Sequence, residues 1–160
     1  MTRNLQKMYS VVGILMPLEF LAQFYTIASS GFATVANEIP SAGNASVTST
    51  TVQGVELFAA AHAVIGVFIV PLTILALVAL SFGARLSRRT RVLTALLFLL
   101  WVLQFALAFI GFVGAAPIAG LHGINALALV GLGIYLVKSN WAFWHQGPPT
   151  PTQPNGTLTP

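Results

Sequence analysis

Four long apolar segments, separated by short polar or charged stretches, dominate the hydrophobic pattern of the chain. They cover about residues 8–30, 57–82, 92–113 and 117–137. Each has about 20 residues or more, the length that an α-helix needs to cross a hydrocarbon core of about 30 Å. The pattern therefore predicts an all-α integral membrane protein, folded as an up-down-up-down four-helix bundle over residues 1–138.

The connecting stretches have the composition of loops. Residues 41–53 are rich in Ser, Thr, Gly, Asn and Ala and predict a solvated loop, and residues 114–117 predict a tight turn. Residues 139–160 form a tail that we expect to be cytoplasmic and largely disordered. A cleaved signal peptide is an alternative for the first apolar segment, but this segment exceeds the roughly 7–15 residues of a signal core and contains Pro17 and Glu19.

The composition excludes a water-soluble domain. The chain has 160 residues, of which 56% are hydrophobic and only 6% are charged. A soluble domain carries roughly a quarter charged residues, because polar groups must cover most of its surface. We therefore expect lipid to surround most of this chain.

The positions of the charges predict how the bundle is oriented. Cytoplasmic flanks of membrane helices collect Lys and Arg. All seven bases precede the first segment, lie between the second and third, or follow the fourth: Arg3, Lys7, Arg85, Arg88, Arg89, Arg91 and Lys138. Both termini should therefore be cytoplasmic, with Glu38 and Glu56 on the opposite side. Because these bases flank spans instead of lining one soluble face, the net charge of +4 does not predict a nucleic-acid partner.

The absence of cysteine excludes several kinds of chemistry. Disulfides, thiolate metal sites, iron–sulfur clusters and covalent haem attachment all need this residue. The sequence also contains no nucleophile–base pair, phosphate-binding glycine loop or zinc-protease helix motif, so it predicts no independent catalytic activity.

A few polar side chains lie within the predicted spans, where each is costly unless it is paired or coordinated. They are Glu19, Gln23, His62, Thr73, Gln104, His122 and Asn125. At about 1.5 Å per residue, His62 and His122 both lie roughly 8–9 Å inside the outer surface. We expect most of the polar groups to share one layer of the bundle.

The matched depth of the two histidines favours a haem site. In the predicted bundle, the second and fourth spans are diagonal neighbours, so His62 and His122 face each other across the interior. Two imidazoles on opposite sides of one iron are the ligands of a six-coordinate b-type haem. Gly66 and Ala126, each four residues after a histidine, leave room for the macrocycle. Gln104 and Asn125 complete the predicted cofactor-binding set, with His62 and His122 as iron ligands.

Two alternatives remain open. The polar layer could serve only to fix helix packing in a non-catalytic structural or assembly subunit that has no cofactor. Alternatively, His62, His122 and Glu19 could bind copper or zinc, if the three groups converge within about 2–2.2 Å of one ion. Without a metal, Glu19 is expected to be protonated and bonded to Gln23, Gln104 or a histidine.

Several stretches of the chain resemble a family of small four-span bacterial membrane proteins to which no function is assigned. The resemblance lies in residues 20–25, 61–66, 103–104 and 121–127, and its most specific part is the pair His-x-x-x-Gly and Leu-His-x-x-Asn-Ala-Leu. More loosely, the histidine positions are similar to one half of haem A synthase and to b-type membrane cytochromes. The resemblance implies that His62 and His122 are axial haem ligands in a protein of the bacterial cytoplasmic membrane. We also expect partners among other membrane protein subunits or further copies of the chain. The chain lacks the cysteine pair of haem A synthase and has half its length, so haem modification is not expected.

Overall fold

All regular secondary structure in the described part of the chain is helical. The computed structural model describes residues 2–38, 49–114 and 116–143. Its elements are α1 (Thr2–Glu38), α2 (Ser49–Val64), a short π-helix η1 (Ile65–Ile69), α3 (Val70–Gly83), α4 (Arg88–Phe112) and α5 (Ala116–Ser139). Because α2, η1 and α3 follow without interruption, they make one long helix. Four helices are long and apolar enough to cross a membrane, which confirms that part of the prediction.

The helices extend beyond the predicted apolar segments. The predicted loop at residues 41–53 is wrong at its end, because α2 already begins at Ser49. Ser and Thr cost a helix at most about 0.7 kcal/mol each, so the helix can begin several residues before the predicted apolar segment. After the end of α3, the next helix, α4, begins at Arg88. Ser87 caps its N-terminus, since the Ser87 hydroxyl accepts a hydrogen bond from the Thr90 backbone N–H at 3.1 Å.

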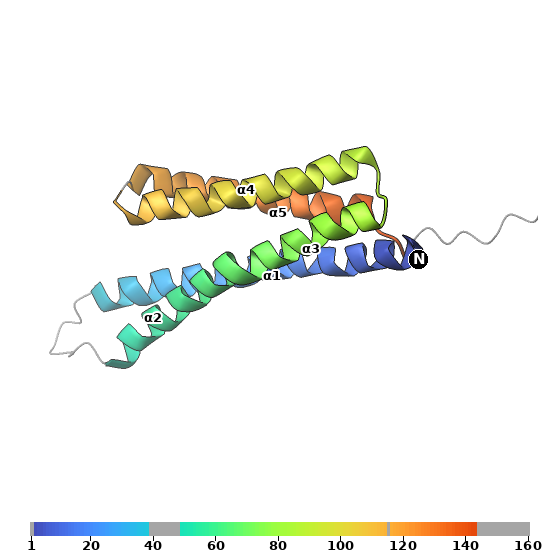
Figure 1. The fold of residues 1–160 in the computed structure, drawn as a ribbon. Helices are drawn as coiled ribbons and strands as arrows, with labels where there is room; N and C mark the ends of the chain where they lie inside the picture. Colours follow the sequence, from blue (N-terminus) through green and yellow to red (C-terminus); the bar gives the residue numbers. More distant parts are fainter. Residues whose placement is uncertain (1, 39–48, 115, 144–160) are drawn as a thin grey trace, which may run out of the picture.

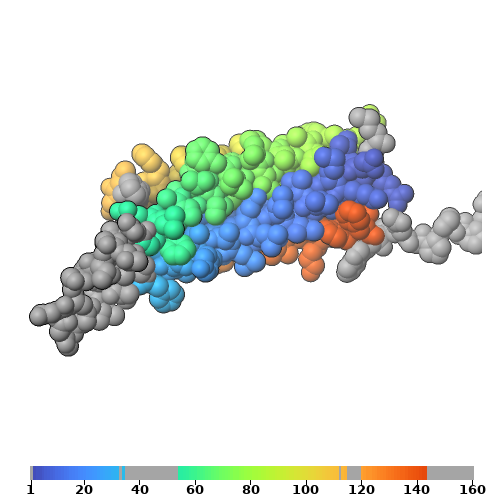
Figure 2. Space-filling model, turned by 90° about the horizontal axis from the view of Figure 1, so that it is seen from below, coloured from blue at the N-terminus to red at the C-terminus, as the bar shows by residue number. Residues whose placement is uncertain are grey.

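The helices form two pairs that meet at one end of the molecule. Helix α1 packs against α2 and α3, and α4 packs against α5. The pairs are joined by contacts between α3 and α4 and between α1 and α5. In Figure 1 the start of α1, the connection from α3 to α4 and the end of α5 lie together, whereas the pairs separate toward the opposite end. Figure 2 shows α1 lying side by side with the long α2–α3 helix.

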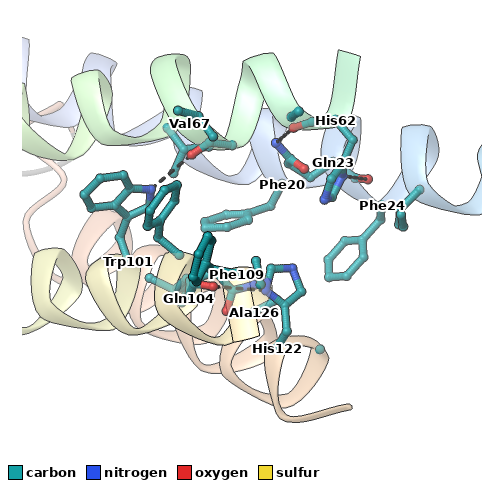
Figure 3. Close-up of a pocket in the computed structure, with 18 of the residues that line it drawn as sticks. Phe20, Gln23, Phe24, His62, Val67, Trp101, Gln104, Phe109, His122 and Ala126 are labelled. Carbon is teal, nitrogen blue, oxygen red and sulfur yellow. Dashed lines mark hydrogen bonds between the residues drawn. The ribbon is translucent and has the colours of Figure 1, made fainter. Parts of the chain in front are cut away.

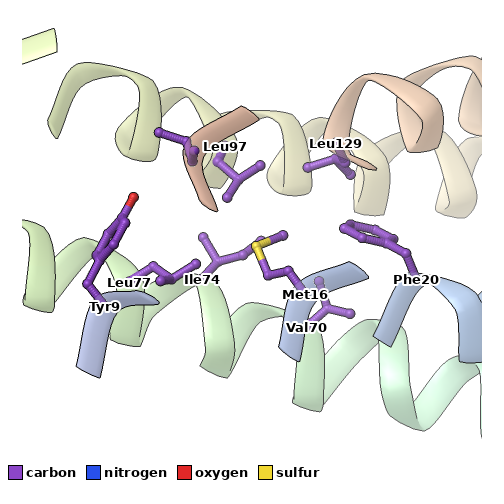
Figure 4. Packing of buried hydrophobic residues seen from close by; sticks show 9 residues of the cluster. Tyr9, Met16, Phe20, Val70, Ile74, Leu77, Leu97 and Leu129 are labelled. Carbon is purple, nitrogen blue, oxygen red and sulfur yellow. The ribbon is translucent and has the colours of Figure 1, made fainter. Parts of the chain in front are cut away.

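The packed core lies in the half of the bundle where the pairs meet. Its buried members come from α1, α3, α4 and α5: Tyr9, Met16, Phe20, Val70, Ile74, Leu77, Leu97, Leu129 and Leu136. Figure 4 shows these side chains filling the space between the two pairs. Polar contacts reinforce this half, since the hydroxyl groups of Tyr9 and Thr94 lie 2.9 Å apart and both residues are buried.

The residues that follow α5 fold back onto α1. The Ser10 hydroxyl donates to the Asn140 carbonyl at 3.0 Å and accepts from the Ala142 backbone N–H at 3.1 Å. The first residues of the predicted tail are thus ordered against α1, which offers polar partners to their backbone. The rest of the predicted tail, from residue 144, lies outside the described residues.

Candidate functional site

A cavity of about 670 Å³ separates the two helix pairs in the half where they diverge. This volume lies within the range of about 300–1,000 Å³ that is typical of small-molecule and cofactor sites. Its walls are mostly aliphatic and aromatic, and they include Phe20, Phe24 and Phe109. The polar side chains on the wall are those of Gln23, His62, Trp101, Gln104 and His122. Figure 3 shows the two histidines on opposite sides of this space, His62 on α2 and His122 on α5.

His62 is held by a reciprocal pair of hydrogen bonds with α1. Its Nδ1 atom lies 3.2 Å from the backbone carbonyl oxygen of Gln23. The Gln23 side-chain amide in turn donates to the His62 backbone carbonyl at 2.9 Å. Since a carbonyl only accepts hydrogen bonds, Nδ1 of a neutral His62 must carry the proton. Nε2 then keeps its lone pair for a ligand.

His122 is held by α4 through one such bond, without the return bond that Gln23 makes to the His62 backbone. Its Nδ1 atom lies 3.1 Å from the backbone carbonyl oxygen of Gln104. The Gln104 side-chain oxygen accepts from the Asn125 amide at 2.7 Å, and this amide also donates to the Leu100 carbonyl at 2.8 Å. Histidines that ligate metals almost always donate their other ring N–H to an acceptor of this kind. Both rings are therefore oriented as metal ligands are.

The spacing of the two imidazoles is suitable for one metal ion between them. Their ring centroids are 6.5 Å apart, and the ring planes meet at 60°. Two nitrogens bound on opposite sides of one ion, at about 2 Å each, place the ring centroids roughly 6 Å apart. The observed centroid separation of 6.5 Å is close to this value, so the two rings have the spacing needed to hold one ion between them.

The small residues of the predicted site have different surroundings. Ala126 is buried and lines the cavity. Gly66 also lines the cavity, but a Cβ atom at this position would lie 3.1 Å from the Gln23 side-chain nitrogen. Gly66 therefore leaves room for the amide that binds the His62 carbonyl. Asn125, the last member of the predicted set, is buried between α4 and α5 and is not among the lining residues.

A π-helical segment follows His62 and was not predicted from the sequence. Within it, the Val70 N–H bonds to the Ile65 carbonyl, five residues back. The next such bond would join residue 71 to the Gly66 carbonyl, but Pro71 has no N–H. The Trp101 indole N–H of α4 donates to this carbonyl instead, at 3.1 Å. Figure 3 shows the bond crossing the cavity wall between the two helix pairs.

Glu19 lies apart from the histidines. Its carboxyl accepts a hydrogen bond from the Thr73 hydroxyl of α3, instead of bonding to a glutamine or histidine as expected. The other carboxyl oxygen is buried and has no hydrogen-bond partner in the part of the chain that the structure describes. Glu19 does not line the cavity. Among the described residues, no three His, Asp or Glu side chains are grouped so as to hold a metal ion.

The carbonyl acceptors of the two histidines were missed in the sequence, although an internal repeat points to them. Gln23-Phe24 in the first span corresponds to Gln104-Phe105 in the third. Each pair precedes a span that carries a histidine with a small residue four positions later. In the structure, each glutamine backbone carbonyl faces the histidine of the following span. The two helix pairs thus build similar halves of one site.

Comparisons with known proteins give no match to this chain among family models, curated proteins or solved structures. The similarity to haem A synthase and b-type cytochromes therefore stays a prediction. Any functional conclusion rests on the geometry of the cavity and its two histidines.

Proposed function

We propose that this chain is a multi-pass membrane protein that binds a b-type haem through His62 and His122. Its role would be electron transfer, or redox or accessory support within a larger membrane complex. The observation that carries the proposal is the pair of imidazoles whose Nδ1 atoms contact backbone carbonyls and whose centroids are 6.5 Å apart across an apolar cavity.

The residues around the cavity have the chemistry that a haem requires. A bound haem would supply reversible one-electron chemistry at its iron. His62 and His122 would hold the haem iron through their Nε2 atoms, and the carbonyl groups of Gln23 and Gln104 would keep each ring in the tautomer that can bind it. The apolar and aromatic walls would contact the macrocycle and limit the access of water, which is one of the ways in which proteins set a haem's potential.

The orientation of the bundle follows from its charges. We infer an up-down-up-down bundle in the bacterial cytoplasmic membrane with both termini in the cytoplasm, because all seven bases flank the same ends of the predicted spans. The site then lies nearer the outer surface. Since the chain has no cysteine, single cysteines can report its topology. A membrane-impermeant maleimide should label Val113→Cys in intact cells but label Ser139→Cys only after lysis, and the opposite pattern would reverse the orientation.

The experiment that tests the haem proposal is an absorbance spectrum of the purified protein, as isolated and after addition of haemin. We expect an intense Soret band, and the sharp α and β bands of low-spin haem after reduction. His62→Gly and His122→Gly should each lose the low-spin spectrum, and free imidazole should restore it by occupying the vacated space. The matched control is His145→Gly, which removes the third histidine of the chain.

Two results would refute the proposal. One is a well-folded protein that shows no Soret band even with added haemin. The other is a low-spin spectrum that is unchanged in both histidine variants. The first result would favour the accessory subunit without a cofactor, and metal analysis of the same sample would test for copper or zinc.

A further inference from the structure

The bases of the chain gather at the end of the bundle where the helix pairs meet. They lie at the start of α1, in and after the connection from α3 to α4, and at the end of α5. The three acids of the chain lie elsewhere in the sequence, at positions 19, 38 and 56. This end therefore carries positive charge without nearby acidic residues along the chain.

The connection from α3 to α4 places an arginine in an unfavourable backbone conformation. Arg85 has a φ of 51°, in the left-handed region where glycine is the usual residue. The Arg85 N–H bonds to the Phe82 carbonyl at 3.0 Å, and the Leu86 N–H bonds to the Ser81 carbonyl at 3.1 Å. These two bonds form the turn that commonly ends a helix with glycine at the position of Arg85. Arg85 thus occupies this turn at a conformational cost, which makes its side chain a candidate for a role that glycine could not fill.

Two further arginines follow on one face of α4. Arg88 and Arg91 are three residues apart, so their side chains leave the same face of the helix. The Arg91 guanidinium lies 5.5 Å from the centroid of the Phe82 ring, on the side of α3. Its Nε atom is buried and has no hydrogen-bond acceptor among the described residues. Arg89, in contrast, lies over the Tyr135 ring of α5, at 5.7 Å.

We propose that Arg85, Arg88 and Arg91 bind the phosphodiester headgroup of an acidic phospholipid. We call these three residues the arginine corner. Guanidinium groups bind phosphate oxygens with paired hydrogen bonds, and an arginine near a membrane surface is attracted to acidic lipids. The corner lies at the end of two membrane-length helices, which is the level of lipid headgroups. A lipid also presents its phosphate at this level permanently, whereas a soluble phosphate must come from the water.

The test compares two triple variants that remove the same charge. The corner variant is Arg85→Gln/Arg88→Gln/Arg91→Gln, and the matched control is Arg3→Gln/Arg89→Gln/Lys138→Gln. Delipidated full-length protein is titrated with phosphatidylglycerol or phosphatidylcholine, and native mass spectrometry measures the bound lipid. We expect wild type and control to prefer phosphatidylglycerol. The corner variant should bind it on the order of 100-fold more weakly, since each of the three arginines contributes roughly fivefold.

Three results would overturn the assignment. Equal loss in the two triple variants would indicate diffuse attraction by net charge. Unchanged binding in the corner variant would exclude the three arginines. Complete displacement of the lipid by millimolar glycerol phosphate would identify a soluble anion as the ligand. If the corner variant does not fold, Arg85→Gly replaces it, because glycine suits this backbone. It should bind phosphatidylglycerol about fivefold more weakly, and unchanged affinity would refute the proposal. Haem absorbance should be the same in all these variants, so this test is independent of the haem proposal.

Discussion

The hydrogen bond between Trp101 and the Gly66 carbonyl predicts a measurable coupling between two helices. Pro71 deprives this carbonyl of its backbone donor, and the Trp101 indole replaces that donor. Trp101→Phe keeps an aromatic ring but removes the N–H. Within the hydrocarbon, where no water is at hand, the unpaired carbonyl should cost about 1–3 kcal/mol of the free energy of unfolding.

A second substitution isolates the contribution of the hydrogen bond. In Pro71→Ala, the restored N–H at position 71 can bond to the Gly66 carbonyl, as the Val70 N–H already does with the Ile65 carbonyl. Trp101→Phe should then be less harmful in the Pro71→Ala background than in the wild type. We expect a coupling of about 1 kcal/mol, near the upper part of the range for polar contacts between membrane helices.

The free energies are measured by titration with SDS in mixed micelles, with the helical circular dichroism signal as the readout. The four proteins of the cycle are wild type, each single variant and the double variant. If the two effects add within about 0.3–0.5 kcal/mol, the residues are not coupled and the structural reason given for this bond is wrong.

Three other predictions use the same titration. Arg85→Gly should stabilise the protein by about 1 kcal/mol, because glycine adopts a positive φ without strain, and a loss of stability would contradict the strained turn. Tyr9→Phe should destabilise it by about 1 kcal/mol through loss of the bond to Thr94, and a neutral effect would mean that this buried contact contributes nothing. Gly13→Ala should cost about 1–3 kcal/mol, because its Cβ would lie 2.8 Å from a methyl group of Val137, and a stable variant would show that α1 and α5 can separate easily.

The helices could be predicted from the sequence because the membrane leaves few options. A long apolar segment in lipid must satisfy its own backbone, and an α-helix does so within one segment. The predicted boundaries were less accurate, since α4 begins at Arg88 and α2 at Ser49, where hydrophobicity gives no signal. Helix ends depend on caps and local propensity, as the bond to the Ser87 hydroxyl illustrates.

The polar layer could be predicted as a list of residues but not as a set of contacts. Depth along a helix follows from residue number, which is why His62 and His122 could be assigned to one level. The partner of a side chain depends on the rotation of each helix about its axis, and one residue changes this by about 100°. Glu19 therefore bonds to Thr73 of α3 instead of to a group in the cavity. The backbone carbonyl groups that face the histidines are part of every residue and leave no trace in composition.

The division of the bundle into a packed half and a divergent half bears on why the polar layer lies where it does. In lipid, apolar side chains gain little from leaving their surroundings, so close packing and polar contacts hold membrane helices together. The buried cluster around Met16 and Ile74 supplies that packing at one end. At the other end, α2 makes no comparable contact with α4 or α5 among the described residues, and the helix pairs diverge around the cavity. An apolar cavity alone would suit any lipid chain. The two imidazoles on opposite walls, each with Nδ1 next to a backbone carbonyl, are what carries the proposal of a haem, more than the volume of the cavity.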